Sequence, residues 1–188
     1  MMEVLVATGN EHKLREMRHI LGSGFKVLGY GKRVKEDGRT FEENAVKKAK
    51  SIRPKEGQIA IADDSGLMVS ALNGKPGVKS ARFASPPTPE NLCTKLLRKL
   101  GVRNGGRGAK FVCVIAVHYP SGRIKTVKGI CCGKIINEMR GNKGFGYDPV
   151  FVPRGYRRTF AEMRPAMKNR LSHRGRALRK LKVLLGER

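Results

Sequence analysis

Short apolar runs alternate with segments of helical periodicity in the first part of the chain. Residues 3–8 are largely apolar and predict a buried strand, and Asn10 then stands where the N-cap of a helix is expected. Thr40 and Glu43 have the spacing of a capping box, which predicts the start of a second helix. The apolar run that begins at Ile59 predicts the next strand. The chain therefore starts as alternating strands and helices.

The second half of the chain adds a hairpin and further helices. Thr88 is followed by proline, a pair that is typical of a helix start. Residues 110–119 and 123–131 have strand character, and the Pro-Ser-Gly segment 120–122 between them predicts a turn. A last helix is predicted to start at Ser172. Strand-helix units combined with an antiparallel hairpin predict an α/β fold with a mixed sheet.

The composition is that of a folded and strongly basic protein. A length of 188 residues favours a single domain that spans residues 1–188. The 39% of hydrophobic residues argues against disorder. The longest apolar run, residues 111–117, is too short to span a bilayer, and the N-terminus lacks the basic head of a signal peptide. We therefore expect a cytoplasmic protein without a membrane contact. Because two of the four cysteines are adjacent, we expect buried free thiols.

The net charge of +25, from 40 Lys and Arg against 15 Asp and Glu, favours partners that carry phosphate. It does not choose between nucleotides and nucleic acids. Residues 151–188 hold twelve Lys and Arg, so a nucleic-acid contact through this basic tail is physically credible. No aromatic-basic motif, helix-turn-helix or RNP pattern supports it. A nucleic-acid-binding module and a nucleotide sensor without turnover are the two alternatives to an enzyme.

Asp63 and Asp64 are the first candidates for chemistry, because the chain has only four aspartates. They end the strand predicted from Ile59, where we expect the chain to leave the sheet, and ligands of open α/β sheets bind beyond the carboxyl ends of strands. A carboxylate there can hold magnesium or activate water. Glu43 belongs to the capping box, which leaves Glu36 as a further candidate metal ligand. The alternative for the aspartate pair is an Asx-turn or a loop cap.

Two segments have the character of an anion site. Residues 8–13 join a strand to a helix, where free backbone N–H groups and the helix dipole favour an anion, and Lys13 adds a cation. The Walker spacing is absent, so an ordinary helix start is the alternative. Lys48 shares the face of Phe41 and Ala45, which predicts that its ammonium faces an anion unless it reaches solvent along the edge of that face.

Residues 144–149, GFGYDP, have the character of a site for a planar ring. Their glycines let the backbone approach a ligand, Phe145 and Tyr147 can stack on a ring, and Asp148 can accept a hydrogen bond. A tight turn is the alternative. A His-Arg pair at 173–174 places two donors in the first turn of the last predicted helix, unless it is only a surface pair.

Five ordered blocks resemble those of the inosine triphosphate pyrophosphatase family, also called the Ham1 family, over nearly the whole chain. They are ATGNEHK, TFEENAVKKA, IADDSGL with GKPGVKSARFA, GFGYDPVFVP and KNRLSHRGRAL. The resemblance implies an elongated mixed β-sheet flanked by helices, with a cleft between two lobes, in a chain that forms a homodimer. It implies Mg²⁺-dependent hydrolysis of deaminated purine nucleoside triphosphates (ITP, dITP, XTP) to the monophosphate and pyrophosphate, which sanitises the nucleotide pool.

The resemblance also implies roles for individual residues. Asp64 matches the general base and metal ligand, and Glu36 matches the second metal ligand. Glu42 and Asp63 stay open as alternatives to Glu36, because the segment before it aligns loosely. Ser65 accompanies the metal ligands. The positions expected to bind the phosphates are Thr8, Gly9, Asn10, Glu11, His12, Lys13 and Lys48. Those expected to bind the rest of the nucleotide are Phe145, Gly146, Tyr147, Asp148, Lys168, His173 and Arg174.

Overall fold

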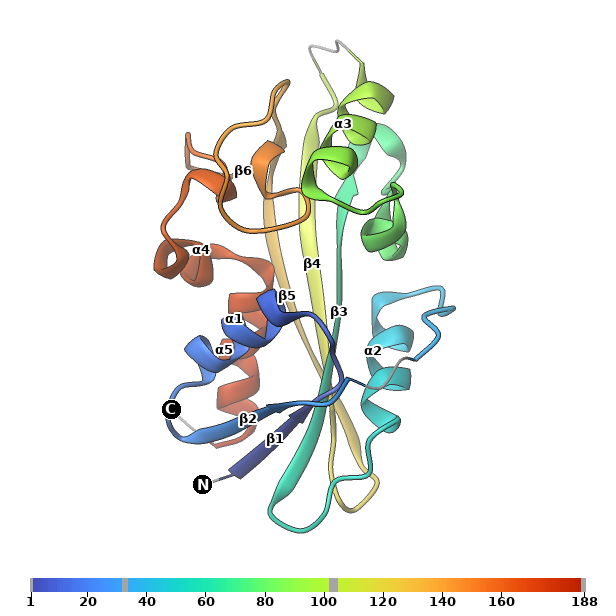
Figure 1. The fold of residues 1–188 in the computed structure, drawn as a ribbon, viewed down its shortest axis with the longest axis vertical. Helices are drawn as coiled ribbons and strands as arrows, with labels where there is room; N and C mark the ends of the chain where they lie inside the picture. The colour runs from blue at the N-terminus through green and yellow to red at the C-terminus, as the bar shows by residue number, and fades with distance from the viewer. Residues whose placement is uncertain (1, 32–33, 102–104, 187–188) are drawn as a thin grey trace. The chain divides into compact units, whose positions relative to one another are not determined.

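A mixed six-stranded sheet organises the computed structural model, which describes residues 2–31, 34–101 and 105–186. The strand order is β2-β1-β3-β4-β5-β6 (Figure 1). The strands are β1 (Met2–Val6), β2 (Phe25–Gly29), β3 (Gln58–Val69), β4 (Gly108–His118), β5 (Ile124–Ile135) and β6 (Phe151–Pro153). β1 is parallel to β2 and β3, whereas β5 and β6 are antiparallel. The predicted α/β class with a mixed sheet is confirmed.

Three of the helices, α1, α2 and α3, begin where the capping residues predict. The α-helices are α1 (Glu11–Leu21), α2 (Phe41–Lys50), α3 (Pro89–Leu100), α4 (Pro165–Leu171) and α5 (His173–Leu184). Asn10, Thr40 and Thr88 each accept hydrogen bonds from backbone N–H groups of the helix that follows. Short 3₁₀ segments are η1 (Ser70–Leu72), η2 (Gly77–Arg82), η3 (Asp148–Val150) and η4 (Phe160–Glu162). Helix α5 begins one residue after the predicted Ser172, because the Ser172 N–H still donates to the Lys168 carbonyl of α4.

Strand β3 is longer than its apolar run predicts. We expected the chain to leave the sheet at Asp64, but the strand continues to Val69. Leu67 and Val69 are fully buried, so the strand continues to bury apolar side chains beyond residues 63–66. The expectation that the aspartates sit at the end of a strand is therefore wrong, and so is the Asx-turn alternative, because both residues lie inside β3.

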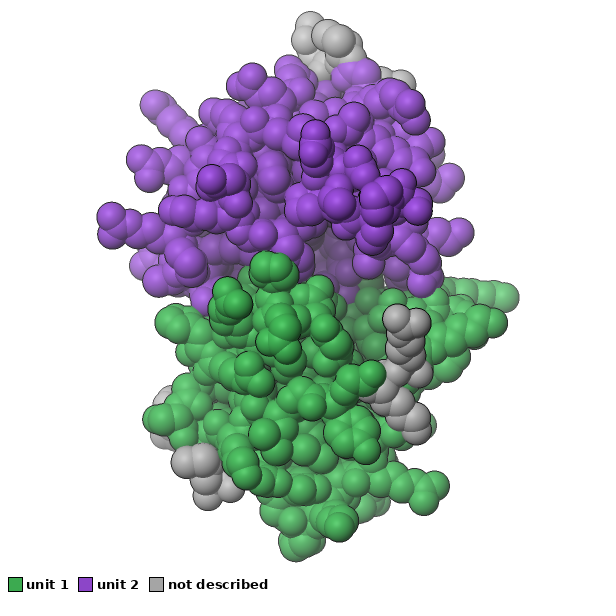
Figure 2. Space-filling model, viewed as in Figure 1, with its two compact units in different colours: residues 1–64, 113–129, 173–188 green, residues 65–112, 130–172 purple. Residues whose placement is uncertain are grey.

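The described residues form two compact units, coloured separately in Figure 2. Unit 1 comprises residues 1–64, 113–129 and 173–188, and unit 2 comprises residues 65–112 and 130–172. In unit 1, α1 and α5 lie side by side and pack on the sheet through Met17, Leu178 and neighbouring apolar side chains. In unit 2, the rings of Phe111, Phe151 and Phe160 form an aromatic cluster with centroids 4.7–6.1 Å apart. The cleft implied by the resemblance stays a prediction.

Two further expectations from the sequence, the free thiols and the hairpin, are compared with the structure here. Cys93, Cys113 and Cys131 are buried free thiols as predicted, whereas Cys132 is exposed. The hairpin is closed as expected by the Tyr119 N–H, which donates to the carbonyl of Arg123 at 3.0 Å. Within residues 2–31, 34–101 and 105–186, no helix combines the length and apolar character that crossing a membrane would require.

Gly129 of β5 gives a test of the packing in unit 1. A Cβ at this position would collide with the His173 carbonyl oxygen and lie 2.5 Å from the Ala177 amide nitrogen. Because both atoms belong to the backbone of α5, neither can move without shifting the helix. We expect Gly129→Ala to lower the free energy of unfolding by about 2 kcal/mol in urea denaturation.

Gly31→Ala is the matched control, because a Cβ there meets no atom of the described residues within 4 Å. We expect it to change the unfolding free energy by less than about 0.5 kcal/mol. Equal stabilities of the two variants would contradict the close approach of α5 to β5.

Candidate functional site

The two adjacent aspartates of β3 point to opposite faces of the sheet. Successive side chains of a strand alternate between the faces. Ile61 has the parity of Asp63 and belongs to the apolar cluster that α1 and α5 form with the sheet. Asp64 has the opposite parity and accepts a hydrogen bond from Asn44 of α2. Asp63 and Asp64 therefore belong to two distinct polar groups, one on each face of the sheet.

Asp63 is the centre of a buried ion-pair network. Lys13 Nζ lies 3.0 Å from Asp63 Oδ1, and Arg174 Nη2 lies 3.0 Å from Asp63 Oδ2. The Arg174 Nη1 group also donates to Glu16 Oε2 at 2.6 Å. The side chains of Asp63 and Arg174 are each 1% exposed. Burial alone would raise the pKa of Asp63, but the charges of Lys13, Arg174 and Lys48 hold it well below its usual value.

Asp64 lies in a different electrostatic environment. Asn44 Nδ2 donates to its Oδ2 at 2.9 Å, and Lys48 Nζ lies 3.8 Å from its Oδ1. Burial and the nearby charge of Glu36 raise the pKa of Asp64, while Lys48 and the Asn44 hydrogen bond oppose them, and the net pKa lies above its ordinary value. A carboxylate with a raised pKa is suited to accept a proton during a reaction.

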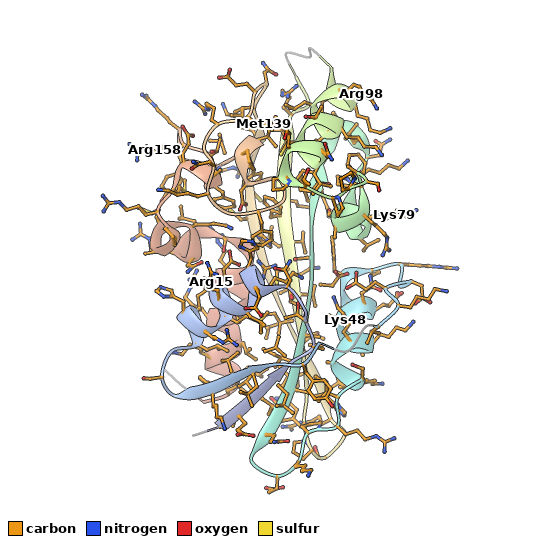
Figure 3. The ribbon with its side chains drawn as sticks, viewed as in Figure 1. Arg15, Lys48, Lys79, Arg98, Met139 and Arg158 are labelled. Atoms are coloured by element: carbon orange, nitrogen blue, oxygen red, sulfur yellow. The ribbon has the colours of Figure 1, made fainter. Side chains whose placement is uncertain are left out.

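Lys48 faces the interior of unit 1, as its helical phase predicts. Figure 3 labels its side chain on α2, and its ammonium contacts Glu36 and Asp64. Burial lowers the pKa of Lys48, but the charges of Asp63, Asp64 and Glu36 outweigh it and leave the pKa raised. Lys47 is half-exposed and pairs instead with Asp37. Lys48 is therefore a buried cation between two carboxylates and does not reach out to solvent.

Glu36 and Asp64 fit a metal that is shared with a ligand. Both carboxylates converge on one cation, the Lys48 ammonium. In the part of the chain that the structure describes, no three His, Cys, Asp or Glu side chains gather as a metal site. Mg²⁺ is typically bound by one or two carboxylates while phosphate oxygens and water complete its shell. The oxygen donors present suit that arrangement better than a closed protein cage.

The two alternative metal ligands lie elsewhere. Glu42 accepts a hydrogen bond from Thr126 Oγ1 at 2.8 Å on the exposed surface. Asp63 faces the other side of the sheet, where Lys13 and Arg174 occupy its oxygens. Among the three candidates, the geometry favours Glu36 beside Asp64.

The segment of residues 8–13 forms the start of helix α1. Asn10 Oδ1 accepts hydrogen bonds from the N–H groups of His12 and Lys13 at 3.0 and 3.3 Å, and Thr8 Oγ1 accepts one from the Asn10 N–H. Gly9 to His12 are exposed, and a Cβ at Gly9 would meet no atom within 4 Å in the part of the chain that the structure describes. A ligand can therefore approach the backbone at Gly9.

Unit 2 holds a second cluster of predicted site residues. Asp148 Oδ2 accepts hydrogen bonds from the Phe145 N–H at 2.8 Å and from Lys168 Nζ at 2.7 Å. The Lys168 ammonium lies 4.5 Å from the centroid of the Phe145 ring, a cation–π contact. Gly144 has φ +78°, and a Cβ there would collide with Asp148 Oδ2. The half-buried Phe145 ring and the buried side chains of Asp148 and Lys168 are therefore in mutual contact.

Tyr147 does not serve as a stacking ring. Its side chain is 3% exposed in the unit 2 core, and its hydroxyl donates to the Ser80 carbonyl at 2.9 Å. Burial raises the pKa of this hydroxyl well above its ordinary value. We expected that either ring of GFGYDP can stack on a ligand. Of the two, the half-buried Phe145 ring is the one that can.

The predicted residues divide between the two units. Those in unit 1 are Thr8, Gly9, Asn10, Glu11, His12, Lys13, Glu36, Lys48, Asp64, His173 and Arg174. Those in unit 2 are Ser65, Phe145, Gly146, Tyr147, Asp148 and Lys168. His173 and Arg174 are buried, so the alternative of a surface pair is wrong.

Two polar contacts of the site residues were missed by sequence reasoning. Asn44 contacts Asp64, and Glu16 contacts Arg174. Asn44 lies four residues before Lys48, a spacing that puts both on one helix face and that could have identified it. For Glu16 and Arg174, which are 158 residues apart, the sequence carries no comparable local signal.

Comparison with known proteins gives consistent matches over nearly the whole chain. The sequence pattern of the Ham1 family matches residues 4–184. The chain is 46% identical to a dITP/XTP pyrophosphatase of Desulforamulus reducens, covering 98% of this chain and 96% of the relative. It is also 46% identical to a dITP/XTP pyrophosphatase of Bacillus licheniformis over the full length of both. The structure of a HAM1 protein from Coxiella burnetii is similar, with a TM-score of 0.87, 39% identity and 98% of each chain covered.

The different environments of the two aspartates predict losses of stability of different size for the same substitution. In Asp63→Asn, Arg174 and Lys13 lose their shared buried counter-ion, so we expect the free energy of unfolding to fall by about 3–5 kcal/mol. Asp64→Asn keeps an oxygen that can accept from Asn44 and relieves the repulsion from Glu36, so we expect a loss of less than about 1 kcal/mol. Urea denaturation of both variants at neutral pH measures the difference. Equal losses would show that Asp63 is not the structural member of the pair.

Proposed function

Because the chain belongs to the Ham1 family, we propose that it hydrolyses ITP, dITP and XTP to the nucleoside monophosphate and pyrophosphate. The names of its relatives, dITP/XTP pyrophosphatases at 46% identity over nearly the whole chain, support this substrate class. The structural observation that carries the proposal is Asp64, a buried carboxylate with a raised pKa beside Lys48 and Glu36. The reaction removes deaminated purines from the nucleotide pool, and residues 1–188 act as one catalytic domain.

The proposed chemistry is attack of water on the α-phosphorus. Asp64 accepts the proton of this water, the new P–O bond forms, and the bond to the β-phosphate breaks so that pyrophosphate leaves. Lys48 and Lys13 contribute fixed cations to the phosphate oxygens. Glu36 and Asp64 are the residues that would hold Mg²⁺. When bound, Mg²⁺ supplies neutralisation of charge on the phosphate oxygens.

We assign recognition of the base to the second cluster and to the start of α5. Phe145 offers a face for stacking, and Asp148 with Lys168 offers an acceptor and a donor. His173 and Arg174 are proposed to donate to the 6-oxo group. The contacts of Arg174 with Asp63 and Glu16 fix the plane of its guanidinium. A 6-amino group offers no acceptor to such donors, so ATP is disfavoured.

We further propose that the chain forms a homodimer and is located in the cytoplasm. The four cysteines are free thiols, which suits a reducing compartment. Light scattering coupled to size-exclusion chromatography tests the dimer, because a mass equal to one chain would contradict it.

Replacement of the general base gives the first test of this function. The wild-type protein with Mg²⁺ is expected to release pyrophosphate from ITP faster than from ATP or GTP. Asp64→Asn is expected to lower kcat by about 100-fold or more, while the KM for ITP changes little, because the substituted amide cannot take up the proton. A coupled pyrophosphate assay measures both. Release of orthophosphate, or near-normal turnover by the variant, would refute this chemistry.

Two neighbouring lysines of α2 give a matched test of phosphate binding. Lys48 is buried beside Glu36 and Asp64, whereas Lys47 is half-exposed and pairs with Asp37. We expect Lys48→Ala to raise the KM for ITP about tenfold or more, since a hydrogen bond to a charged group is worth roughly 1.5–3 kcal/mol. Lys47→Ala should leave the KM within about twofold of wild type, because an exposed ion pair contributes little free energy. Comparable KM values for the two variants would exclude Lys48 from the phosphate site.

A further inference from the structure

Asn44 is a completely buried polar side chain at the end of the first turn of α2. Its Oδ1 accepts a hydrogen bond from the Gly38 N–H at 2.8 Å, and its Nδ2 donates to Asp64 Oδ2 at 2.9 Å. A backbone N–H can only donate and an ionised carboxylate can only accept, so these partners fix which end of the amide faces which group. One side chain therefore connects the loop before α2 to the reactive carboxylate of β3.

The loop that carries Glu36 is seated closely on this helix start. A Cβ at Gly38 would lie 2.6 Å from Asn44 Oδ1 and 2.9 Å from Glu43 Cβ. The next residue, Arg39, donates its N–H to Glu43 Oε2 at 2.8 Å. These contacts hold the backbone two and three residues after Glu36 against α2. The position of Glu36 relative to Asp64 consequently depends on the Asn44 amide.

We infer that Asn44 is a positioning residue of the hydrolytic site. Its amide sets the rotation of the Asp64 carboxylate and ties the Glu36 loop to the same helix. The hydrogen bond at Oδ2 directs the other oxygen, Oδ1, toward Lys48, 3.8 Å away. The inference rests on the proposed function, in which Asp64 accepts a proton and Glu36 and Asp64 hold a divalent cation. It goes beyond that function because Asn44 itself contacts neither substrate nor water in the proposed reaction.

Asn44→Ala tests the inference by removing both hydrogen bonds. We expect kcat for ITP to fall about 10- to 100-fold, with the KM for ITP within about threefold of wild type, as is usual when a residue that orients a ligand is lost. We also expect Mn²⁺ alone, titrated calorimetrically without nucleotide, to bind about tenfold more weakly. A residue that only stabilises the fold would not separate kcat from KM in this way.

Asn91→Ala is the matched control, because Asn91 is also in the first turn of a helix and donates its Nδ2 to the Pro86 carbonyl at 3.0 Å. We expect its kcat, KM and Mn²⁺ affinity to equal those of the wild type. Thermal unfolding of each variant checks that the proteins compared are folded.

Asn44→Asp is a second variant of nearly the same shape, for the case in which Asn44→Ala does not fold. It keeps an acceptor for the Gly38 N–H but places an oxygen opposite Asp64 Oδ2, and we expect kcat to fall as well.

Wild-type kcat and Mn²⁺ affinity in the folded Asn44 variants, together with an inactive Asp64→Asn, would overturn the inference and leave the proposed function standing. If the wild-type protein releases no pyrophosphate from ITP, the proposed function fails instead, and the Mn²⁺ titration alone then decides whether Asn44 orders the carboxylates.

Discussion

The burial of two adjacent carboxylates in β3 is the constraint on which the charged interior of unit 1 depends. A buried carboxylate is costly unless cations or hydrogen-bond donors compensate it. Because a strand sends Asp63 and Asp64 to opposite faces, each needs its own partners. Helices α1 and α5 supply Lys13 and Arg174 on one face, and α2 supplies Lys48 and Asn44 on the other. The packing of these helices thus serves an electrostatic need as well as an apolar one.

The degree of compensation separates the roles of the two residues. Asp63 has hydrogen-bonded cations on both oxygens, which hold its pKa low, so it remains an anion that organises its neighbours. At Asp64, the neutral Asn44 amide donates to one oxygen, the Lys48 ammonium lies 3.8 Å from the other, and the pKa is raised. Two chemically identical side chains therefore differ in proton affinity because of their surroundings. This difference is the physical reason for assigning the reactive role to Asp64.

Local signals in the sequence predict much of this arrangement. The capping residues Asn10, Thr40 and Thr88 locate three helix starts, and the helical phase correctly predicts that Lys48 is buried. The sequence fails where long-range packing decides. The polar residues at 63–66 resemble a strand end, yet buried residues beyond them extend β3. The pairing of Arg174 with Asp63 joins residues 111 positions apart, for which no periodicity provides a signal.

The balance of charge around β3 also bears on the cation requirement. Among the described residues in the ion pairs around either aspartate, Glu16, Glu36, Asp63 and Asp64 carry negative charge, and Lys13, Lys48 and Arg174 carry positive charge. These residues together therefore carry no excess of positive charge, although the whole chain carries +25. A triphosphate brought beside it adds further negative charge at short range, where repulsion is poorly screened. The excess of basic residues elsewhere cannot replace a cation at that point. For this reason we propose that Glu36 and Asp64 bind a divalent metal that is shared with the phosphates.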